Sequence, residues 1–242
     1  FVATEVNMQH REDNHQGTPP LMVVRALISR AASRPNEHGK HTRRIRTWDV
    51  RKAFFNAELN ETIYVHPGRR LCKPGYCWWL RKALYGTRLA SQMWGETVNA
   101  AFDDAGAIVL RSMCGVFLVE ETVADSDCTV CVHGDDFLGE GNDKELDRVH
   151  EVLSANFEVT DAGAVGPGCP GEVRCLKRLV GYTEMLPGTS LPGFYWKADS
   201  KNIIELMTWA KKARGIKASV TPGTKATGAN MRTALDPLPH QR

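Results

Sequence analysis

The sequence predicts an α+β fold in which helices cover one face of an antiparallel sheet. Apolar residues recur at helical spacing in four separate segments, and β-rich runs lie between these segments. A tight turn at 133–136 joins two of the runs as a hairpin. A strand and a hairpin separated by a helix are typical of this class. With 242 residues, 42% of them hydrophobic, the chain can bury one sizeable core or two modest ones.

The first predicted helix starts near Thr18, whose side chain can cap it. Pro19 and Pro20 would occupy its first turn, where a missing N–H costs nothing. Apolar residues then follow helical spacing until Pro35, which forbids continuation. These apolar residues are Leu21, Val24, Leu27, Ile28 and Ala31.

Strands are predicted in the middle of the chain. One run passes through 48–50 after the basic stretch 40–46, and a second helix carrying Trp94 ends before Gly106. We expect Trp94 and the pair at 78–79 to lie in the core rather than to form base-stacking platforms. Further β-rich runs lie at 63–65, 77–80, 116–119 and 128–132.

Two helices are predicted in the last hundred residues. Asn142 and Glu145 form a capping box for the first of them. Residues 161–193 are rich in Gly and Pro, so we expect a linker or long loop there. Asp199 or Ser200 can cap the last helix, and the chain beyond it is expected to be loosely ordered.

The composition favours an intracellular protein that is neither secreted nor embedded in a membrane. No apolar run approaches the roughly 20 residues that span a bilayer, and no signal-peptide pattern is present. The seven cysteines are an odd number without framework spacing, which indicates a reduced setting. Cys128 and Cys131 would point to opposite faces of a strand, which argues against a shared zinc ion. The chain starts with Phe1 rather than Met, so we expect a fragment of a longer protein.

The net charge of +3 hides an uneven distribution. Residues 1–100 carry +8, residues 101–160 carry −11 and residues 161–242 carry +6. An acidic centre between basic flanks fits a cation site with arms that attract a polyanion. An unevenly charged, solvated surface explains the charge alone equally simply.

The sequence Gly134-Asp135-Asp136 carries the strongest chemical signal. Two adjacent carboxylates between β-like runs repel each other, and a divalent cation would relieve this repulsion. An exposed turn is the alternative, as expected for the pair Asp103-Asp104 at a helix end. If the strand bearing Asp49 lies beside the hairpin, three carboxylates converge. Two-metal phosphoryl transfer needs this arrangement, with the cations about 3.5–4 Å apart.

Four blocks of the chain, spread over 18–165, resemble copia-type (Ty1/copia) retrotransposon reverse transcriptases in the order of that family. The blocks are TWDVRKAFFNAEL at 47–59 with IYV at 63–65, LRKALYGTR at 80–88 with Trp94, VHGDDFL at 132–138, and FEVTDAG at 157–163. Weaker similarity at 219–222 matches a segment that precedes the family's RNase H region. The resemblance implies a fragment of a Pol polyprotein, located in a cytoplasmic virus-like particle or the nucleus.

The resemblance also implies a fold and a division into domains. The fold would be a polymerase palm, a ferredoxin-like antiparallel sheet with helices on one face, with partial fingers and thumb. Residues 1–40 would be an N-terminal fingers remnant, and 41–165 the palm with a fingers insertion near 58–88. Residues 166–242 would be a linker and a thumb-like C-terminal segment.

The implied activity is RNA-directed DNA polymerisation, the addition of dNTPs to a primer 3′-end on an RNA or DNA template. Asp49, Asp135 and Asp136 would hold two Mg²⁺ ions, for which Mn²⁺ could substitute. The downstream RNase H region of the parent polyprotein would be a further partner, and no membrane would be involved.

Other roles follow from the same resemblance. Backbone N–H groups of Arg51, Lys52 and Ala53 would cradle the triphosphate, and Phe54 would exclude a ribose 2′-hydroxyl. A second group would lie near the nascent base pair or template: Tyr85, Gly86 and Arg88.

Two departures from the family pattern leave alternatives open. His133 and Gly134 replace an aromatic and an apolar residue, and the block after Gly86 lacks the family's Gln and Pro. The alternative is a catalytically inactive, truncated remnant that only binds nucleic acid. A metal-dependent phosphohydrolase and a zinc-stabilised binding module are further alternatives.

Overall fold

The computed structural model describes residues 18–34, 42–68, 70–71, 73–119, 127–188, 190–198 and 200–214. The expectations for the first 17 residues, for Pro35 and for the tail beyond 214 fall outside these residues. The chain forms two units, Phe1–Ala198 and Asp199–Arg242, and each is described by itself.

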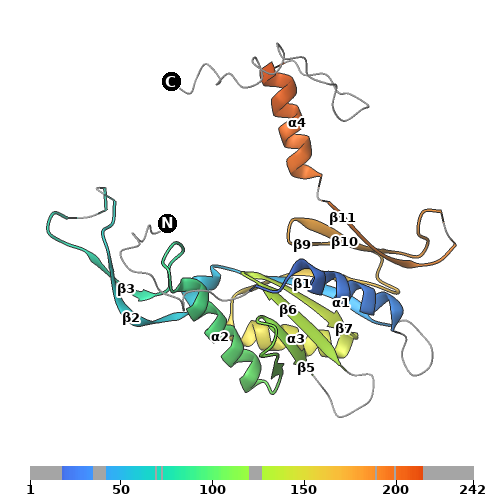
Figure 1. Ribbon diagram of the computed structural model, residues 1–242, viewed down its shortest axis with the longest axis horizontal. Helices are drawn as coiled ribbons and strands as arrows, with labels where there is room; N and C mark the ends of the chain where they lie inside the picture. The colour runs from blue at the N-terminus through green and yellow to red at the C-terminus, as the bar shows by residue number, and fades with distance from the viewer. Residues whose placement is uncertain are drawn as a thin grey trace. The chain divides into compact units, whose positions relative to one another are not determined.

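Within the described residues, the first unit is built on a six-stranded antiparallel sheet with the order β4-β5-β6-β7-β1-β8 (Figure 1). Strand β1 therefore lies between the β6–β7 hairpin and β8. The predicted strand through 48–50 and the predicted hairpin around 133–136 are both confirmed. The strands are β1 Arg44–Val50, β4 Ile108–Val109, β5 Val116–Val119, β6 Cys128–His133, β7 Asp136–Gly141 and β8 Val159–Val165.

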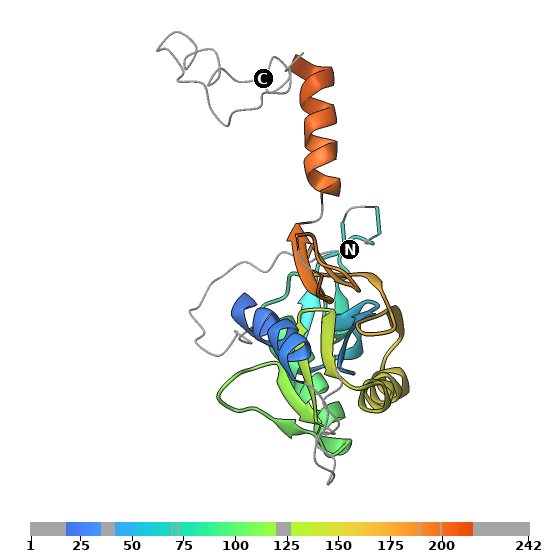
Figure 2. The same ribbon diagram turned by 90° about the vertical axis from the view of Figure 1, so that its right-hand side faces the viewer.

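Helices cover both faces of this sheet. Helices α2 and α3 pack on the face that carries Trp48 and Phe137, whereas α1 packs on the face that carries Ile45 and Leu138 (Figures 1 and 2). The prediction of helices on one face only is therefore wrong for α1. Adjacent residues of the central strands are apolar, so both faces need cover. The helices are α1 Leu21–Ser33, α2 Ala90–Asp104 and α3 Asp143–Asn156.

The two helix starts that the sequence addressed have different outcomes. The side chain of Asn142 accepts a 3.4 Å hydrogen bond from the N–H of Glu145, so the predicted cap of α3 is confirmed. The predicted cap of α1 is wrong, because Pro20 is the N-cap residue and no side chain caps it. Proline fixes its own φ and can start a helix without a side-chain acceptor.

A cluster of charged side chains joins α1 to the sheet. Glu140, fully buried on β7, accepts from Nε and Nη2 of Arg43 and lies 2.8 Å from Nε of Arg30. Asp127 accepts from the guanidinium groups of Arg30, Arg34 and Arg43 at 2.9–3.1 Å. We call these five residues the arginine clamp. The clamp contributes to the position of α1 on its face of the sheet.

Acid is expected to weaken the arginine clamp. Burial acts to raise the pKa of Asp127, but the charges of Arg30, Arg43 and Arg34 outweigh it and hold the pKa below its usual value. Such a carboxyl stabilises the fold above its unfolded pKa of about 3.9 and loses this contribution as the pH falls through the folded pKa. The melting temperature should therefore drop between about pH 5 and pH 3, and less steeply in Asp127→Asn. Equal slopes in both proteins would contradict this expectation.

Residues 161–193 are not a linker. They form most of a three-stranded antiparallel sheet with the order β11-β10-β9, and this sheet covers part of the α1 face. The Gly and Pro residues misled the prediction because they lie between short strands. The β9–β10 turn uses Leu176 and Lys177 with φ of 50° and 58°, a conformation that glycine usually supplies. The strands are β9 Gly171–Cys175, β10 Arg178–Thr183 and β11 Gly193–Ala198.

A separate two-stranded ribbon consists of β2 Glu58–Val65 and β3 Trp78–Lys82. It extends away from the six-stranded sheet (Figure 1). Trp94 is 2% exposed, so its predicted core position is confirmed. The same prediction is wrong for Trp78 and Trp79, which are 44% and 55% exposed, because a two-stranded ribbon has no further layer to bury them.

The second unit contributes helix α4 Lys201–Arg214, which confirms the last predicted helix. Its first turn is marked by a 2.8 Å hydrogen bond from the N–H of Ile204 to the carbonyl of Ser200. None of the helices in the described residues is long and apolar enough to cross a membrane.

Candidate active site

The end of β1 and the β6–β7 turn bring three carboxylates together. Asp49 lies directly opposite Asp136 in the β1–β7 register. Asp135 occupies the turn, and its carbonyl accepts a 3.0 Å hydrogen bond from the N–H of Val50. Asp49 and Asp135 are exposed, and Asp136 is half-buried. The carboxylates that the sequence singled out thus share one edge of the sheet.

The pKa values of two of these groups record their mutual repulsion. Burial, and after it the charge of Asp135, raises the pKa of Asp49. Burial also raises the pKa of Asp136, and the charges of Asp135 and Asp49 raise it further. His133 and a hydrogen bond from the backbone of Leu176 act in the opposite direction. Clustered carboxylates with raised pKa values are typical of sites that bind a cation or a proton.

The donor set suits a hard divalent cation, because Mg²⁺ prefers carboxylate oxygens. Within the described ranges, no three His, Cys, Asp or Glu side chains stand close enough to be a ready-made metal site. The fit to a cation therefore rests on the oxygen donors and on the mutual repulsion of the three Asp residues. Cys128 and Cys131 face opposite sides of the sheet, as the sequence predicted.

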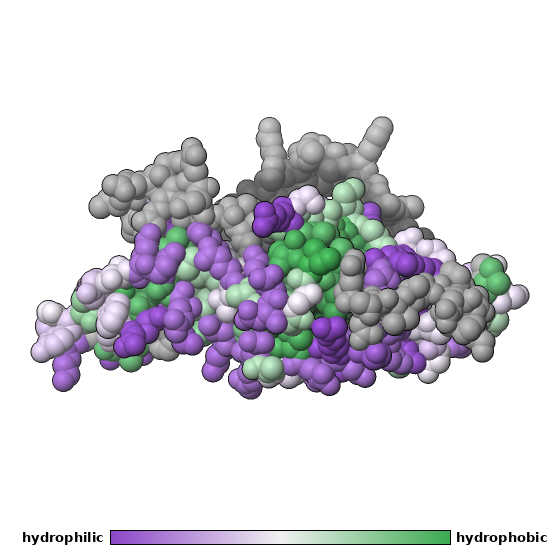
Figure 3. Space-filling view, turned by 90° about the horizontal axis from the view of Figure 1, so that it is seen from below, coloured by the Kyte–Doolittle hydropathy of each residue, from purple (hydrophilic) through white to green (hydrophobic). Residues whose placement is uncertain are grey.

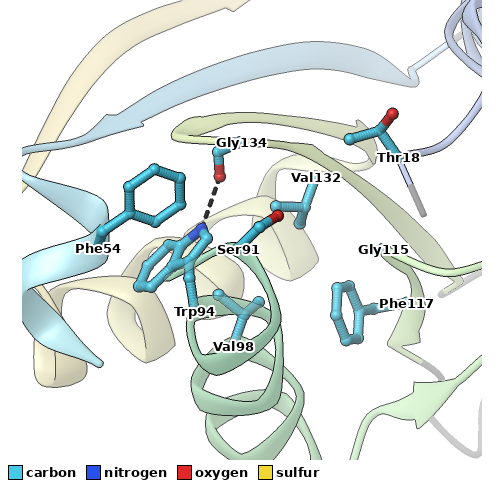
Figure 4. A pocket seen from close by; sticks show the side chains of 9 residues that line it. All are labelled: Thr18, Phe54, Ser91, Trp94, Val98, Gly115, Phe117, Val132 and Gly134. Carbon is cyan, nitrogen blue, oxygen red and sulfur yellow. Dashed lines mark hydrogen bonds between the residues drawn. The ribbon is translucent and has the colours of Figure 1, made fainter. Parts of the chain in front are cut away.

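Trp94 holds the turn that carries the carboxylates. Its indole N–H donates a 2.7 Å hydrogen bond to the carbonyl of Gly134 (Figure 4). The ring packs edge-on against Phe157 and Phe137, at centroid distances of 5.0 and 6.4 Å. Gly134 has a φ of 70°, which glycine adopts without strain. A buried tryptophan thereby fixes the turn at the position where the sequence departs from the family pattern.

A small cavity of about 30 Å³ lies beneath this turn (Figure 4). Phe54 and Trp94 form one side, and Val132 and Phe117 lie across from them. This volume is enough for a water molecule but far too small for a nucleotide. The cavity therefore separates the catalytic edge from the core and is not itself a substrate site.

The loop after β1 is only partly available to a ligand. The N–H of Arg51 donates a 2.9 Å hydrogen bond to the carbonyl of Glu158, and its guanidinium pairs with the same residue. The expected phosphate contact from the Arg51 N–H is therefore wrong, since β8 already uses this donor. Lys52 has a left-handed φ of 54° and is followed by a short 3-10 helix, Ala53–Asn56. Lys52 is exposed and Ala53 is buried.

An aromatic group lies next to the carboxylates. The ring of Phe54 packs against Tyr85 at a centroid distance of 4.5 Å, and Phe55 contacts Tyr85 at 6.1 Å. Burial raises the pKa of the Tyr85 hydroxyl, and the charges of Asp135 and Asp49 add to this effect. Tyr85 therefore lies within electrostatic reach of both carboxylates, although the two blocks are far apart in sequence.

Gly86 and Arg88 belong to the turn between Tyr85 and α2. Gly86 is exposed with a φ of 90°, and Arg88 is half-buried. Thr87 closes this turn through hydrogen bonds from its N–H and its hydroxyl to the carbonyl of Leu84, at 3.0 and 2.8 Å. The turn thus places Gly86 beside Tyr85, but these contacts do not extend to the three carboxylates.

Leu176 is a residue of the site that sequence reasoning missed. Its backbone reaches the carboxyl group of Asp136 from the β9–β10 turn. No sequence signal marks this turn, because Leu and Lys occupy positions where Gly or Asn would be expected. The contact exists only because the three-stranded sheet lies against the end of β7.

Two comparisons with known proteins bear on this site. The family described as reverse transcriptase (RNA-dependent DNA polymerase) matches residues 22–167, which is more than half of the chain. A Saccharomyces cerevisiae protein named for the transposon Ty5-1 is 30% identical over 121 residues. That alignment covers 48% of this chain and 39% of the yeast protein. The match to the family includes all three carboxylates, Tyr85 and Trp94.

Proposed function

The chain belongs to the reverse transcriptase (RNA-dependent DNA polymerase) family, and we propose that it adds dNTPs to a primer 3′-end on an RNA or DNA template. The observation that carries the proposal is the register of β1 and β7, which sets Asp49 opposite Asp136 with Asp135 in the adjoining turn. A polymerase needs carboxylates in this grouping to bind cations at the reacting phosphate.

The residues of the site have separate tasks in this proposal. Asp49, Asp135 and Asp136 would hold two divalent cations, Mg²⁺ or Mn²⁺. When bound, these ions activate the primer 3′-hydroxyl and neutralise charge on the triphosphate and the leaving pyrophosphate. The Trp94 hydrogen bond keeps the turn of Asp135 in place, so the carboxylates need little reorganisation. Exposed Lys52 offers a positive charge to the triphosphate.

The Phe54–Tyr85 pair is proposed as the wall against which the sugar of the nucleotide lies. Phe54 is fixed on both sides, by the ring of Tyr85 and by the core beneath it. A rigid ring at this position leaves no room for a 2′-hydroxyl, which favours deoxynucleotides. Gly86 and Arg88 would lie along the template side of the same turn.

Replacing Phe54 by Ala is expected to relax the choice of sugar. The ratio of ribonucleotide to deoxynucleotide incorporation should rise roughly tenfold or more, because the steric barrier is removed. Single-nucleotide extension with dTTP and with UTP measures this ratio, which does not depend on how much protein is folded. Phe55→Ala is the matched control, since Phe55 touches the same tyrosine at a longer distance. An equal change in both variants would contradict the assignment.

The larger organisation belongs to the same proposal. The six-stranded sheet would be the palm, the β2–β3 ribbon part of the fingers, and α4 part of the thumb. The RNase H region would be a separate part of the parent polyprotein. Since the chain covers 39% of the yeast relative, the activity of the whole protein is likewise proposed. An intracellular location, in a virus-like particle or the nucleus, stays a prediction.

Primer extension tests the proposed function. We expect the full chain to extend an oligo(dT) primer on poly(rA) with Mg²⁺ or Mn²⁺ and to stop when EDTA is added. Binding of the cation should be visible without catalysis, as a rise in melting temperature with Mg²⁺. Salt-dependent duplex binding without extension, even with Mn²⁺, would identify an inactive remnant. Release of nucleotides from the primer would identify a phosphohydrolase.

A further inference from the structure

The β2–β3 ribbon carries an aromatic pair on its outward face. Tyr64 and Trp79 lie directly opposite each other in the register and are 64% and 55% exposed. Arg81 follows two positions after Trp79 on the same face, with its guanidinium 4.9 Å from the centre of the Trp79 ring. Large aromatic side chains at such exposure are unusual unless they meet a partner.

The other face of the ribbon accounts for its folding. Ile63 and Leu80 are paired there and are partly buried, and Ile63 packs against the main core. Val65 is also partly buried, opposite Trp78. The outward aromatic pair is therefore not required to anchor the ribbon to the sheet.

A hollow of about 310 Å³ lies beside Trp79 and Arg81. The β2–β3 register shifts between Glu58 and Ile63, and the strand segment within this shift forms the far wall of the hollow. Asn60 and Thr62 bring an amide and a hydroxyl to this wall. The hollow thus combines an aromatic wall with hydrogen-bonding groups, at a size that suits one nucleobase.

The charges around the hollow indicate which part of a nucleic acid enters it. Glu58 and Glu61 line it and would repel a phosphate. Exposed cations surround it on the same ribbon and its connecting segment: Arg70, Lys73, Arg81 and Lys82. In Figure 3 the ribbon forms the left end, where hydrophilic side chains gather around a smaller hydrophobic area. A base inside and phosphates outside is the arrangement that fits these charges.

We propose that the outward face of the β2–β3 ribbon binds an unpaired strand of nucleic acid, with one base stacked on Trp79. Aromatic stacking tolerates every base, and Arg81 extends the stacking surface with a planar cation. The site is separate from the three carboxylates and needs no metal ion. It rests on the proposed function only for the identity of the ligand, which a polymerase must hold unpaired ahead of its primer.

Binding of labelled oligonucleotides to the full chain in EDTA tests this site by fluorescence anisotropy. Trp79→Ala should weaken binding of a single-stranded 12-mer roughly tenfold, because stacking on one aromatic supplies about that factor. Trp79→Phe should retain most of the affinity. Trp78→Ala, an exposed tryptophan on the opposite face, is the matched control and should change affinity less than about twofold.

The outcomes separate this site from the polymerase site. Asp135→Asn should bind the 12-mer like the wild type, so loss of polymerisation alone leaves the proposal intact. Equal affinities of Trp79→Ala and Trp78→Ala would overturn it. So would a change of oligomeric state in Trp79→Ala, measured by sedimentation, because the ribbon would then be a protein–protein contact.

Discussion

Replacing Asp135 by Asn is expected to reduce primer extension roughly a hundredfold or more. Asn has nearly the shape of Asp but lacks the negative charge that a divalent cation requires. Asp135 is exposed in the β6–β7 turn, and its backbone carbonyl keeps the hydrogen bond from Val50. The variant should therefore fold, with a melting temperature at least equal to the wild type, because repulsion with Asp49 and Asp136 is relieved.

A matched control exists in the same chain. Asp103 belongs to another adjacent pair of Asp residues, exposed at the end of α2. Asp103→Asn should keep full activity in the same primer extension assay, with Mg²⁺ and with Mn²⁺. If Asp135→Asn extends primers as well as Asp103→Asn does, Asp135 is not a metal ligand and the proposed mechanism is wrong.

The largest effect on stability is expected from Glu140→Ala, at about 3–5 kcal/mol of unfolding free energy. Glu140 is fully buried in the central strand β7, where it accepts from Arg43 and pairs with Arg30. Its removal leaves Arg43, itself only 3% exposed, as a buried charge without its main acceptor. Urea denaturation at neutral pH measures the loss.

An exposed ion pair supplies the comparison for this loss. Glu158 pairs with Arg51 on the surface, with both side chains more than half exposed. Glu158→Ala should cost less than about 1 kcal/mol, because water screens such pairs. Glu140→Gln should lie between these values, since it removes the charge but keeps one acceptor. A cost for Glu140→Ala no larger than for Glu158→Ala would show that the arginine clamp does not hold α1.

The arginine clamp also shows a limit of the sequence. Arg30, Arg43 and Glu140 are separated by up to 110 positions and carry no spacing signal. Charged residues are usually solvated, so nothing in the sequence predicts that a carboxylate of β7 would be buried. The pairing appears only when α1 packs on the face of the sheet that the sequence left uncovered.

The β9–β11 sheet and the β2–β3 ribbon were missed for related reasons. Gly and Pro predict breaks in regular structure but do not reveal short strands between them. Leu176 and Lys177 accept a conformation that their own propensities disfavour, because strand pairing on both sides stabilises it. Exposed Trp78 and Trp79 look like core residues by composition, and only the lack of a second layer places them at the surface.

The sequence by itself determined the order of the main elements, the turn that carries Asp135 and Asp136, and the family. These features depend on local periodicity, on turn chemistry and on motifs, all of which can be read within short windows. Only the tertiary structure decided the rest: that Asp49 faces Asp136, that Trp94 clamps Gly134, that Arg51 is occupied by Glu158, and that α1 lies opposite α2 and α3. Each of these depends on strand register and on packing between distant segments, and local sequence does not specify register until one face of a sheet is buried against another layer.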